Sequence, residues 1–158
     1  VHENLYQSHN LSRINLREYV HDLVAQIDKS YPLLGSSVRV DLDIGDVSLG
    51  IDYAIPLGLV LNEMLSNTYK HAFPEGGAGR ISITRSAENG GDIQVEYRDS
   101  GVGMPGKAEP REGKSLGLQL IYSIIENQLR GRIDGNSRPG EGLSYIIRFT
   151  PGVDRRVI

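Results

Sequence analysis

The sequence predicts an α+β fold in two layers: a mixed, mainly antiparallel sheet with helices packed on one face. Segments that alternate apolar and polar residues, as strands do, follow one another in pairs. Segments with a helical repeat separate these pairs. The order lacks the strict strand–helix alternation of a doubly wound parallel sheet, so we expect the helices on one side only.

The composition describes an ordinary soluble domain. The 158 residues suffice for one hydrophobic core, 39% are hydrophobic, 23% are charged, and the net charge is −3. Nothing basic predicts binding to nucleic acid, and no apolar run approaches the roughly 20 residues of a membrane helix. The chain has no cysteine, so it has neither disulfides nor thiolate chemistry. We therefore expect a cytoplasmic location, no nucleic-acid partner and no direct membrane contact.

The first elements are a linker and a helix. Residues 1–14 are typical of a helix end followed by a loop. Asn15 and Glu18 then form the pattern of a capping box, which opens a helix with one apolar face. That face comprises Leu16, Tyr19, Val20, Leu23, Val24 and Ile27, and the run YPLLG at 31–35 ends the helix.

Two strands and a long helix follow. Alternation predicts a strand from Val38 to Ile44 and a short one from Val47 to Ile51. From Ala54 to Phe73 the periodicity is helical, and Pro74 with the glycines after it stops the helix. The next two strands are predicted at 80–86 and 92–99, joined by a turn at 89–91.

The rest of the chain holds a loop, a helix and two strands. Residues 100–114 are rich in glycine, proline and charge and show no period. A helix is predicted over 115–129, and strands over 131–137 and 142–150 around a turn at 138–141. No internal repeat is evident, so we expect one domain at 15–151 and a loosely held tail at 152–158.

The helix at 54–73 carries an unusual polar half. A step of about 100° per residue gathers its polar side chains on one half and its apolar side chains on the other. The simpler interpretation is a face turned to water. Mid-helix asparagines are poor helix formers, however, and side-chain oxygens one turn apart suit a hard cation such as Mg²⁺. The polar set is Asn62, Glu63, Ser66, Asn67, Lys70 and His71.

Asp99 is a carboxylate at a position where an apolar residue is expected. Ile93, Val95 and Tyr97 alternate toward the core, and Asp99 is the next member of the series. An inward carboxylate is costly unless it is paired or hydrogen-bonded. Because Asp-Ser-Gly is also turn chemistry, Asp99 either caps the following turn or accepts a hydrogen bond from a ligand amino group.

Glycines gather between Asp99 and the next helix. Gly101 and Gly103 follow the aspartate, and Gly113 and Gly117 flank the start of the helix at 115–129. Exposed N–H groups at a helix start favour an anion such as phosphate, and glycine permits close backbone approach. GVGMPG (101–106) has the GxGxxG spacing, but no helix is predicted to open there, as a Rossmann site requires, and the GxxxxGK[ST] of a P-loop is absent.

Three motifs in this order resemble a known family. NEMLSNTYKHAF (62–73) resembles the N box, DSGVGMP (99–105) the G1 box and GKSLGLQLI (113–121) the G2 box of the catalytic domain of sensor histidine kinases. Their superfamily includes gyrase, mismatch-repair and heat-shock chaperone ATPases. The resemblance runs from about residue 37 to 151 and implies the Bergerat-type ATP-binding fold. The form of the first motif is most similar to the HWE kinases, and residues 1–14 resemble the end of a dimerisation hairpin and its linker.

The resemblance implies ATP and Mg²⁺ as the bound groups. Asp99 would accept a hydrogen bond from the adenine amino group, and Mg²⁺ would lie on Asn67, with Glu63 as a second ligand. Lys70 and His71 would contact phosphate oxygens and, with Glu63, act in catalysis. Residues 104–114 would form a lid over the nucleotide. The other nucleotide contacts that the resemblance implies are Asn62, Gly101, Gly103, Gly113, Ser115, Leu116, Gly117 and Ser144.

Glu63 and Ser115 depart from the family's pattern. Many histidine kinases have asparagine where this chain has Glu63, whereas in the wider superfamily a glutamate there activates water for ATP hydrolysis. Glu63 is therefore either a general base or part of the Mg²⁺ site. Ser115 replaces the middle glycine of GxGLGL, and its hydroxyl can still bond phosphate. The phenylalanine-bearing lid motif of many histidine kinases is not found between residues 104 and 113.

The resemblance implies a protein histidine kinase whose acceptor histidine lies outside this chain. None of His2, His9 and His21 falls at the acceptor position, so we expect an upstream dimerisation and phosphoacceptor domain and a homodimer. Phosphate would then pass to an aspartate of a response-regulator receiver domain. Two alternatives stay open: an anti-sigma-factor serine kinase, which would lack the hairpin end at 1–12, and a degenerate nucleotide-sensing module that binds a partner.

Overall fold

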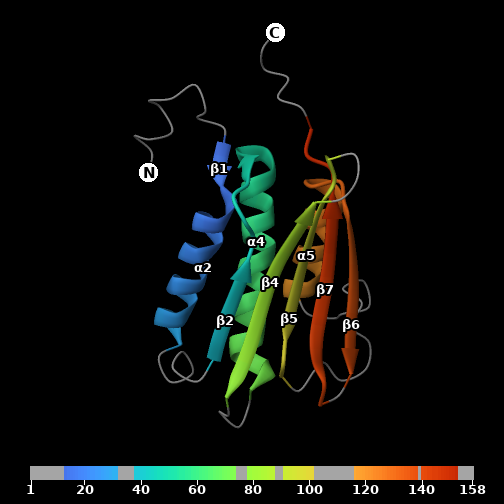
Figure 1. Ribbon diagram of the computed structural model, residues 1–158. Helices are drawn as coiled ribbons and strands as arrows, with labels where there is room; N and C mark the ends of the chain where they lie inside the picture. The colour runs from blue at the N-terminus through green and yellow to red at the C-terminus, as the bar shows by residue number, and fades with distance from the viewer. Residues whose placement is uncertain are drawn as a thin grey trace.

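The main sheet and the helices form the two layers that the sequence predicts (Figure 1). The computed structural model describes residues 13–31, 38–73, 78–87, 91–101, 116–138 and 140–152. Within these ranges the sheet lies in front in Figure 1, and the helices cover its other face. None of the helices described is both long and apolar enough to cross a bilayer.

Helix α2 (Leu16–Ser30) begins at the predicted cap. The backbone N–H of Glu18 donates to the Asn15 side-chain oxygen at 3.0 Å, which satisfies one of the unpaired donors at the helix start. Its apolar face buries Leu16, Val20 and Ile27 against the core, as the helical repeat predicts.

The residues just before α2 form a strand that the sequence does not predict. Strand β1 (Arg13–Asn15) pairs antiparallel with β3 (Ser48–Gly50) in a separate two-stranded sheet. The expectation of a loop through residue 14 is therefore wrong at this end. The expected strand at 47–51 is also shorter than predicted, because the chain turns helical at Ile51.

The five strands of the main sheet are β2 (Val38–Asp43), β4 (Gly79–Ala87), β5 (Ile93–Asp99), β6 (Arg132–Arg138) and β7 (Gly142–Phe149). They lie in the order β2-β4-β5-β7-β6. The pair β2–β4 is parallel and the other three pairs are antiparallel, which confirms the mixed, mainly antiparallel sheet. Helix α4 (Ile51–Asn67) lies between β3 and β4 in the chain, and helix α5 (Leu116–Asn127) precedes β6.

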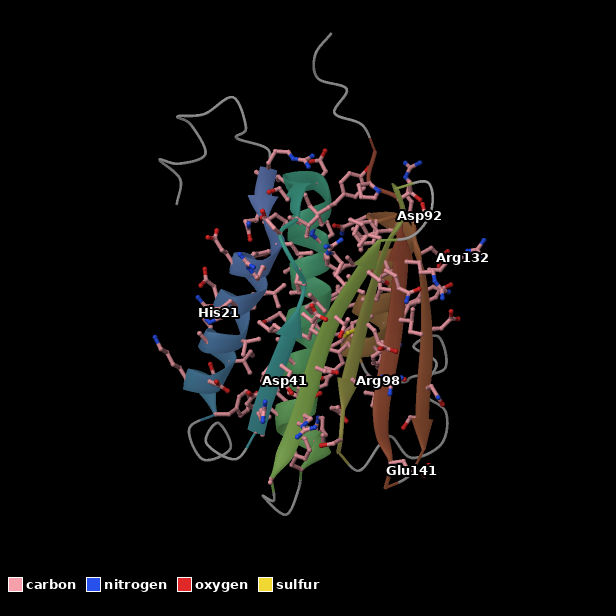
Figure 2. The ribbon with its side chains drawn as sticks, in the orientation of Figure 1. His21, Asp41, Asp92, Arg98, Arg132 and Glu141 are labelled. Carbon is pink, nitrogen blue, oxygen red and sulfur yellow. The ribbon has the colours of Figure 1, made fainter. Side chains whose placement is uncertain are left out.

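The sheet has one apolar and one polar face. The core face packs on the helices and buries Ile81, Ile83, Val95, Tyr97, Tyr145 and Ile147. The outer face carries polar and charged side chains, among them Asp41 on β2 and Arg98 on β5, both labelled in Figure 2. The site predicted from the sequence must therefore lie on the helix-covered side, at the end of the sheet where Asp99 stands.

Candidate functional site

Asp99 is the buried carboxylate at the centre of the site. It ends β5 in register with Ile81 of β4 and Leu143 of β7, and only 7% of its surface is exposed. Its inward direction agrees with the alternation in the sequence. The Gly101 backbone N–H donates to Asp99 Oδ1 at 3.0 Å, and the Leu143 backbone also hydrogen-bonds the carboxylate. Asp99 thus does cap the following turn, and it retains acceptor capacity beyond that turn.

Thr68 is the other partner of Asp99, and the site prediction missed it. The Thr68 hydroxyl donates to Asp99 Oδ2 at 2.8 Å, and its oxygen lies 2.5 Å from the Tyr97 hydroxyl. Tyr97 also reaches the Met64 carbonyl at 3.2 Å. One sequence signal could have found Thr68, since a hydroxyl falls on the apolar half of the helix, the side that faces the sheet.

Two opposing effects act on the pKa of Asp99. Burial raises the pKa of the carboxyl above its ordinary value, because a charge is costly away from water. Hydrogen bonds from Thr68, Gly101 and Leu143 lower the pKa in part, because they stabilise the ionised form. Burial is the larger effect, so the native carboxyl binds a proton more readily than an exposed aspartate does.

The long helix changes its winding where it reaches the site. The sequence predicts one α-helix from 54 to 73, but α4 ends at Asn67 and a π-helix, η1 (Thr68–Ala72), follows. Each turn of a π-helix takes an additional residue, and such turns are frequent at functional sites. Thr68 and Tyr69 are buried in this turn, whereas Lys70 and His71 are exposed. The Tyr69 hydroxyl donates to the Asp28 carboxylate of α2 and thereby ties η1 to that helix.

The polar residues of α4 meet the first turn of α5. Asn62, Glu63 and Asn67 are half-buried. A Cβ on Gly117 would lie 2.8 Å from Glu63 Oε2 and 3.8 Å from Asn67 Nδ2. Gly117 has no Cβ, so the start of α5 lies close to the Glu63 carboxylate without displacing it. The structure therefore brings two oxygen-bearing side chains to the positive end of a helix dipole.

The polar side chains of α4 are of the kind that a small hard cation takes. Glu63 and Asn67 carry a carboxylate and a carboxamide one helical turn apart. Mg²⁺ typically takes one or two protein oxygens and completes its shell with water and phosphate. In the ranges described, no three His, Cys, Asp or Glu side chains gather as a metal cluster.

Some of the remaining predicted site residues lie near Asp99, some lie away from it, and some fall outside the described residues. Gly101 packs on η1, because a Cβ there would lie 2.3 Å from the Ala72 Cβ, so the fold itself requires this glycine. Leu116, at the start of α5, is 81% exposed. Ser144 is opposite Arg98 on the outer face of the sheet, so the structure does not bring it together with Asp99. Gly103, Gly113 and Ser115, and the expected lid at 104–114, lie outside the described residues.

Comparison with known proteins assigns most of the chain to the ATPase superfamily that its three motifs resemble. Residues 52–153 match the family described as histidine kinase-, DNA gyrase B- and HSP90-like ATPase. The sensor histidine kinase PdtaS of Mycobacterium tuberculosis is 28% identical over 159 aligned positions, which cover 96% of this chain and 30% of PdtaS. This chain therefore spans less than a third of the length of that relative.

Solved structures share the fold. The histidine kinase domain of the Erythrobacter litoralis EL346 blue-light-activated kinase superposes with a TM-score of 0.77 at 24% identity, covering 87% of this chain and 62% of that one. The histidine kinase ThkA, solved in complex with the response regulator protein TrrA, gives a TM-score of 0.70 at 19% identity, covering 92% of this chain and 43% of that one. With the family match over 52–153, the chain belongs to the histidine kinase-, DNA gyrase B- and HSP90-like ATPases.

Proposed function

We propose that this chain is the ATP-binding catalytic domain of a two-component sensor histidine kinase. It presents Mg-ATP so that the γ-phosphoryl group is transferred to a histidine on another domain. The observation that carries the proposal is Asp99, a buried carboxylate hydrogen-bonded by Thr68 and by two backbone groups. These hydrogen bonds offset the cost of burying the carboxylate, and the acceptor capacity that they leave matches an amino group.

Adenine recognition follows from the chemistry of the carboxylate. An ionised carboxylate can only accept hydrogen bonds. Adenine offers an amino group at the position where guanine offers a carbonyl oxygen. Asp99 therefore attracts ATP and repels GTP, and the close packing of Gly101 on Ala72 holds the carboxylate in place.

The phosphate end of the nucleotide would lie along the polar half of α4 and η1. Asn67 and Glu63 would hold a magnesium ion, which when bound supplies positive charge to phosphate oxygens. Lys70 and His71 are exposed on the π-helical turn and available to a phosphate. The start of α5 presents the positive end of a helix dipole, which favours an anion. Glu63 contacts this end of the site through either a metal or a water molecule.

Catalysis in this arrangement is positioning and neutralisation of charge. A ring nitrogen of the acceptor histidine attacks the γ-phosphorus of ATP, the bond to the β,γ-bridging oxygen breaks, and ADP leaves. Lys70 offsets negative charge on the transferring group. The phosphoryl group then passes from the histidine to an aspartate of a response regulator.

The acceptor histidine and the dimer contacts belong to an upstream segment in this proposal. Residues 1–14 form the end of the dimerisation hairpin and its linker, 15–151 the catalytic domain and 152–158 a tail. The aligned region covers 30% of PdtaS, so that kinase has further segments beyond the part that this chain matches. The full-length protein is then a cytoplasmic homodimer, or the cytoplasmic part of a sensor, that acts on a receiver domain.

Calorimetric titration with ATP and GTP, with and without Mg²⁺, tests the proposal. Wild type should bind ATP in preference to GTP, and Asp99→Asn should lower ATP affinity by roughly tenfold or more, because a hydrogen bond to a charge is lost. Asp134→Asn is the matched control, since Asp134 is exposed on the outer face of β6. Absence of ATP binding by wild type would leave only the fold in common with kinases.

A further inference from the structure

A chain of hydrogen bonds extends from Asp99 into the core, and we name it the Thr68 relay. It runs from Asp99 Oδ2 to the Thr68 hydroxyl at 2.8 Å and from there to the Tyr97 hydroxyl at 2.5 Å. Thr68 is 2% exposed and Tyr97 is fully buried. The family resemblance assigned no role to either side chain.

The protons of the relay have one arrangement when Asp99 is ionised. Thr68 has a single hydroxyl proton, and the carboxylate can only accept, so Thr68 donates to Asp99. Tyr97 then donates to the Thr68 oxygen. Its contact with the Met64 carbonyl, at 3.2 Å, is longer than usual for a hydroxyl donor and is the weaker of its two hydrogen bonds. Both hydroxyl dipoles therefore point toward the carboxylate.

The relay also limits what Asp99 can still bind. A carboxylate offers about four acceptor positions. Thr68, the Gly101 N–H and the Leu143 backbone take three of them. About one position is left, which suits one N–H of an amino group. If Asp99 were protonated, it could donate to Thr68 and the relay would reverse toward Tyr97.

We propose that Thr68 and Tyr97 are positioning residues that set purine selectivity by keeping Asp99 an oriented, acceptor-only group. This inference rests on the proposed function, because it concerns the same nucleotide site. Thr68 acts directly on the carboxylate, and Tyr97 acts through Thr68. Neither residue needs to touch the nucleotide.

The pH dependence of binding separates this role from a purely structural one. The Thr68 hydrogen bond lowers the pKa of Asp99 against the larger effect of burial, so its removal raises that pKa further. The titratable groups that act on Tyr97 are Asp99 and the phenols of Tyr69 and Tyr145. Asp28 in turn faces Tyr69. Burial raises the pKa of Tyr97 and Tyr69 above the ordinary phenol value, so these two phenols stay neutral in the range where Asp99 titrates.

The test is a set of ATP and GTP titrations between pH 5 and pH 8 on the wild type and four variants. Thr68→Val keeps the shape and removes the hydroxyl, Thr68→Ser keeps the hydroxyl, and Tyr97→Phe removes the second hydroxyl. Thr84→Val makes the same change on the outer face of β4 and serves as the control. Circular dichroism confirms that each variant is folded.

Thr68→Val should lower ATP affinity about tenfold and narrow the ATP-to-GTP ratio by a similar factor. The pH at which ATP binding is half lost on acidification should rise. Thr68→Ser should retain the wild-type ATP affinity, ATP-to-GTP ratio and pH midpoint. Tyr97→Phe should change the ATP-to-GTP ratio and the pH midpoint in the same direction as Thr68→Val, but by less.

The inference would be overturned by a folded Thr68→Val protein that keeps the wild-type ratio of ATP to GTP affinity and loses half of its ATP binding at the wild-type pH. Should Thr68→Val not fold, an unchanged ratio in Tyr97→Phe would overturn it equally. A wild type that binds no ATP contradicts the proposed function, whereas ATP-selective wild type with insensitive variants contradicts only the relay.

Discussion

Gly117→Ala offers a sharp test of the contact between α4 and α5. The added methyl carbon would lie 2.8 Å from Glu63 Oε2, closer than real Cβ contacts allow, and 3.8 Å from Asn67 Nδ2, an ordinary distance. The Glu63 carboxylate must therefore move by about 0.7 Å to restore contact at roughly 3.5 Å, while Asn67 can stay in place.

The expected effect on folding is small. Alanine favours a helix over glycine by up to about 1 kcal/mol, and rotating a half-buried glutamate away from its rotamer costs about 0.5–1.5 kcal/mol. The two nearly cancel, so the free energy of unfolding should change by less than about 1 kcal/mol. The displaced carboxylate should instead weaken the Mg²⁺-dependent part of ATP binding about tenfold, which is typical when a metal-site side chain loses its support.

Two measurements separate these effects: urea denaturation, and ATP titration with and without Mg²⁺. Gln119→Ala, an exposed change in the same helix, is the control for helix composition. Shortening the side chain in a Glu63→Asp, Gly117→Ala double variant should recover part of the Mg²⁺ dependence. Wild-type Mg²⁺ dependence in stable Gly117→Ala protein would refute the role of this contact in the cation site.

Three further predictions concern stability and pH. Gly58→Ala would place a methyl carbon 2.4 Å from the rigid Tyr19 phenol, so urea denaturation should show a loss of about 1–3 kcal/mol; an unchanged midpoint would contradict this packing. Asn15→Ala removes the α2 cap and should lower the free energy of unfolding by about 1 kcal/mol. Asn15→Ser keeps a capping oxygen, so it should lower the free energy of unfolding only a little if the cap is the cause. Because burial raises the pKa of Asp99 above 3.8, the native state binds its proton more tightly than the unfolded chain. Stability of wild type relative to Asp99→Asn should therefore fall as pH rises from about 4 through the native pKa, and a difference independent of pH would count against a raised pKa.

Local sequence patterns were sufficient to predict the helices and strands whose residues repeat with a strong period. The cap at Asn15, the apolar face of α2 and the inward register of Asp99 all follow from neighbours within a few residues. The alternating strands of the main sheet were placed to within one or two residues for the same reason. The family boxes gave the polar side chains Glu63 and Asn67, which the structure brings to the start of α5.

The features that sequence reasoning missed depend on distant partners. Strand β1 is three residues long, too short to show alternation, and exists because β3 pairs with it. The π-helical turn includes Tyr69, whose hydroxyl bonds Asp28, 41 residues earlier. Thr68 sits on an apolar helix face whose partner, Asp99, arrives from another strand. Ser144 followed from motif likeness alone, which carried no information about which face of β7 it occupies.

The small sheet of β1 and β3 has a mechanical consequence. Strand β1 is joined by three register pairs to β3, and β3 passes directly into α4 at Ile51 without an intervening loop. The backbone N–H of Leu16 also donates to the Val47 carbonyl at 2.9 Å, which adds a fourth tie. The chain at Arg13 is therefore connected through β3 to the first turn of α4. The other end of that helix is Asn67, which is followed directly by Thr68 of η1, so a continuous run of paired backbone and helix joins the start of the catalytic domain to its candidate site.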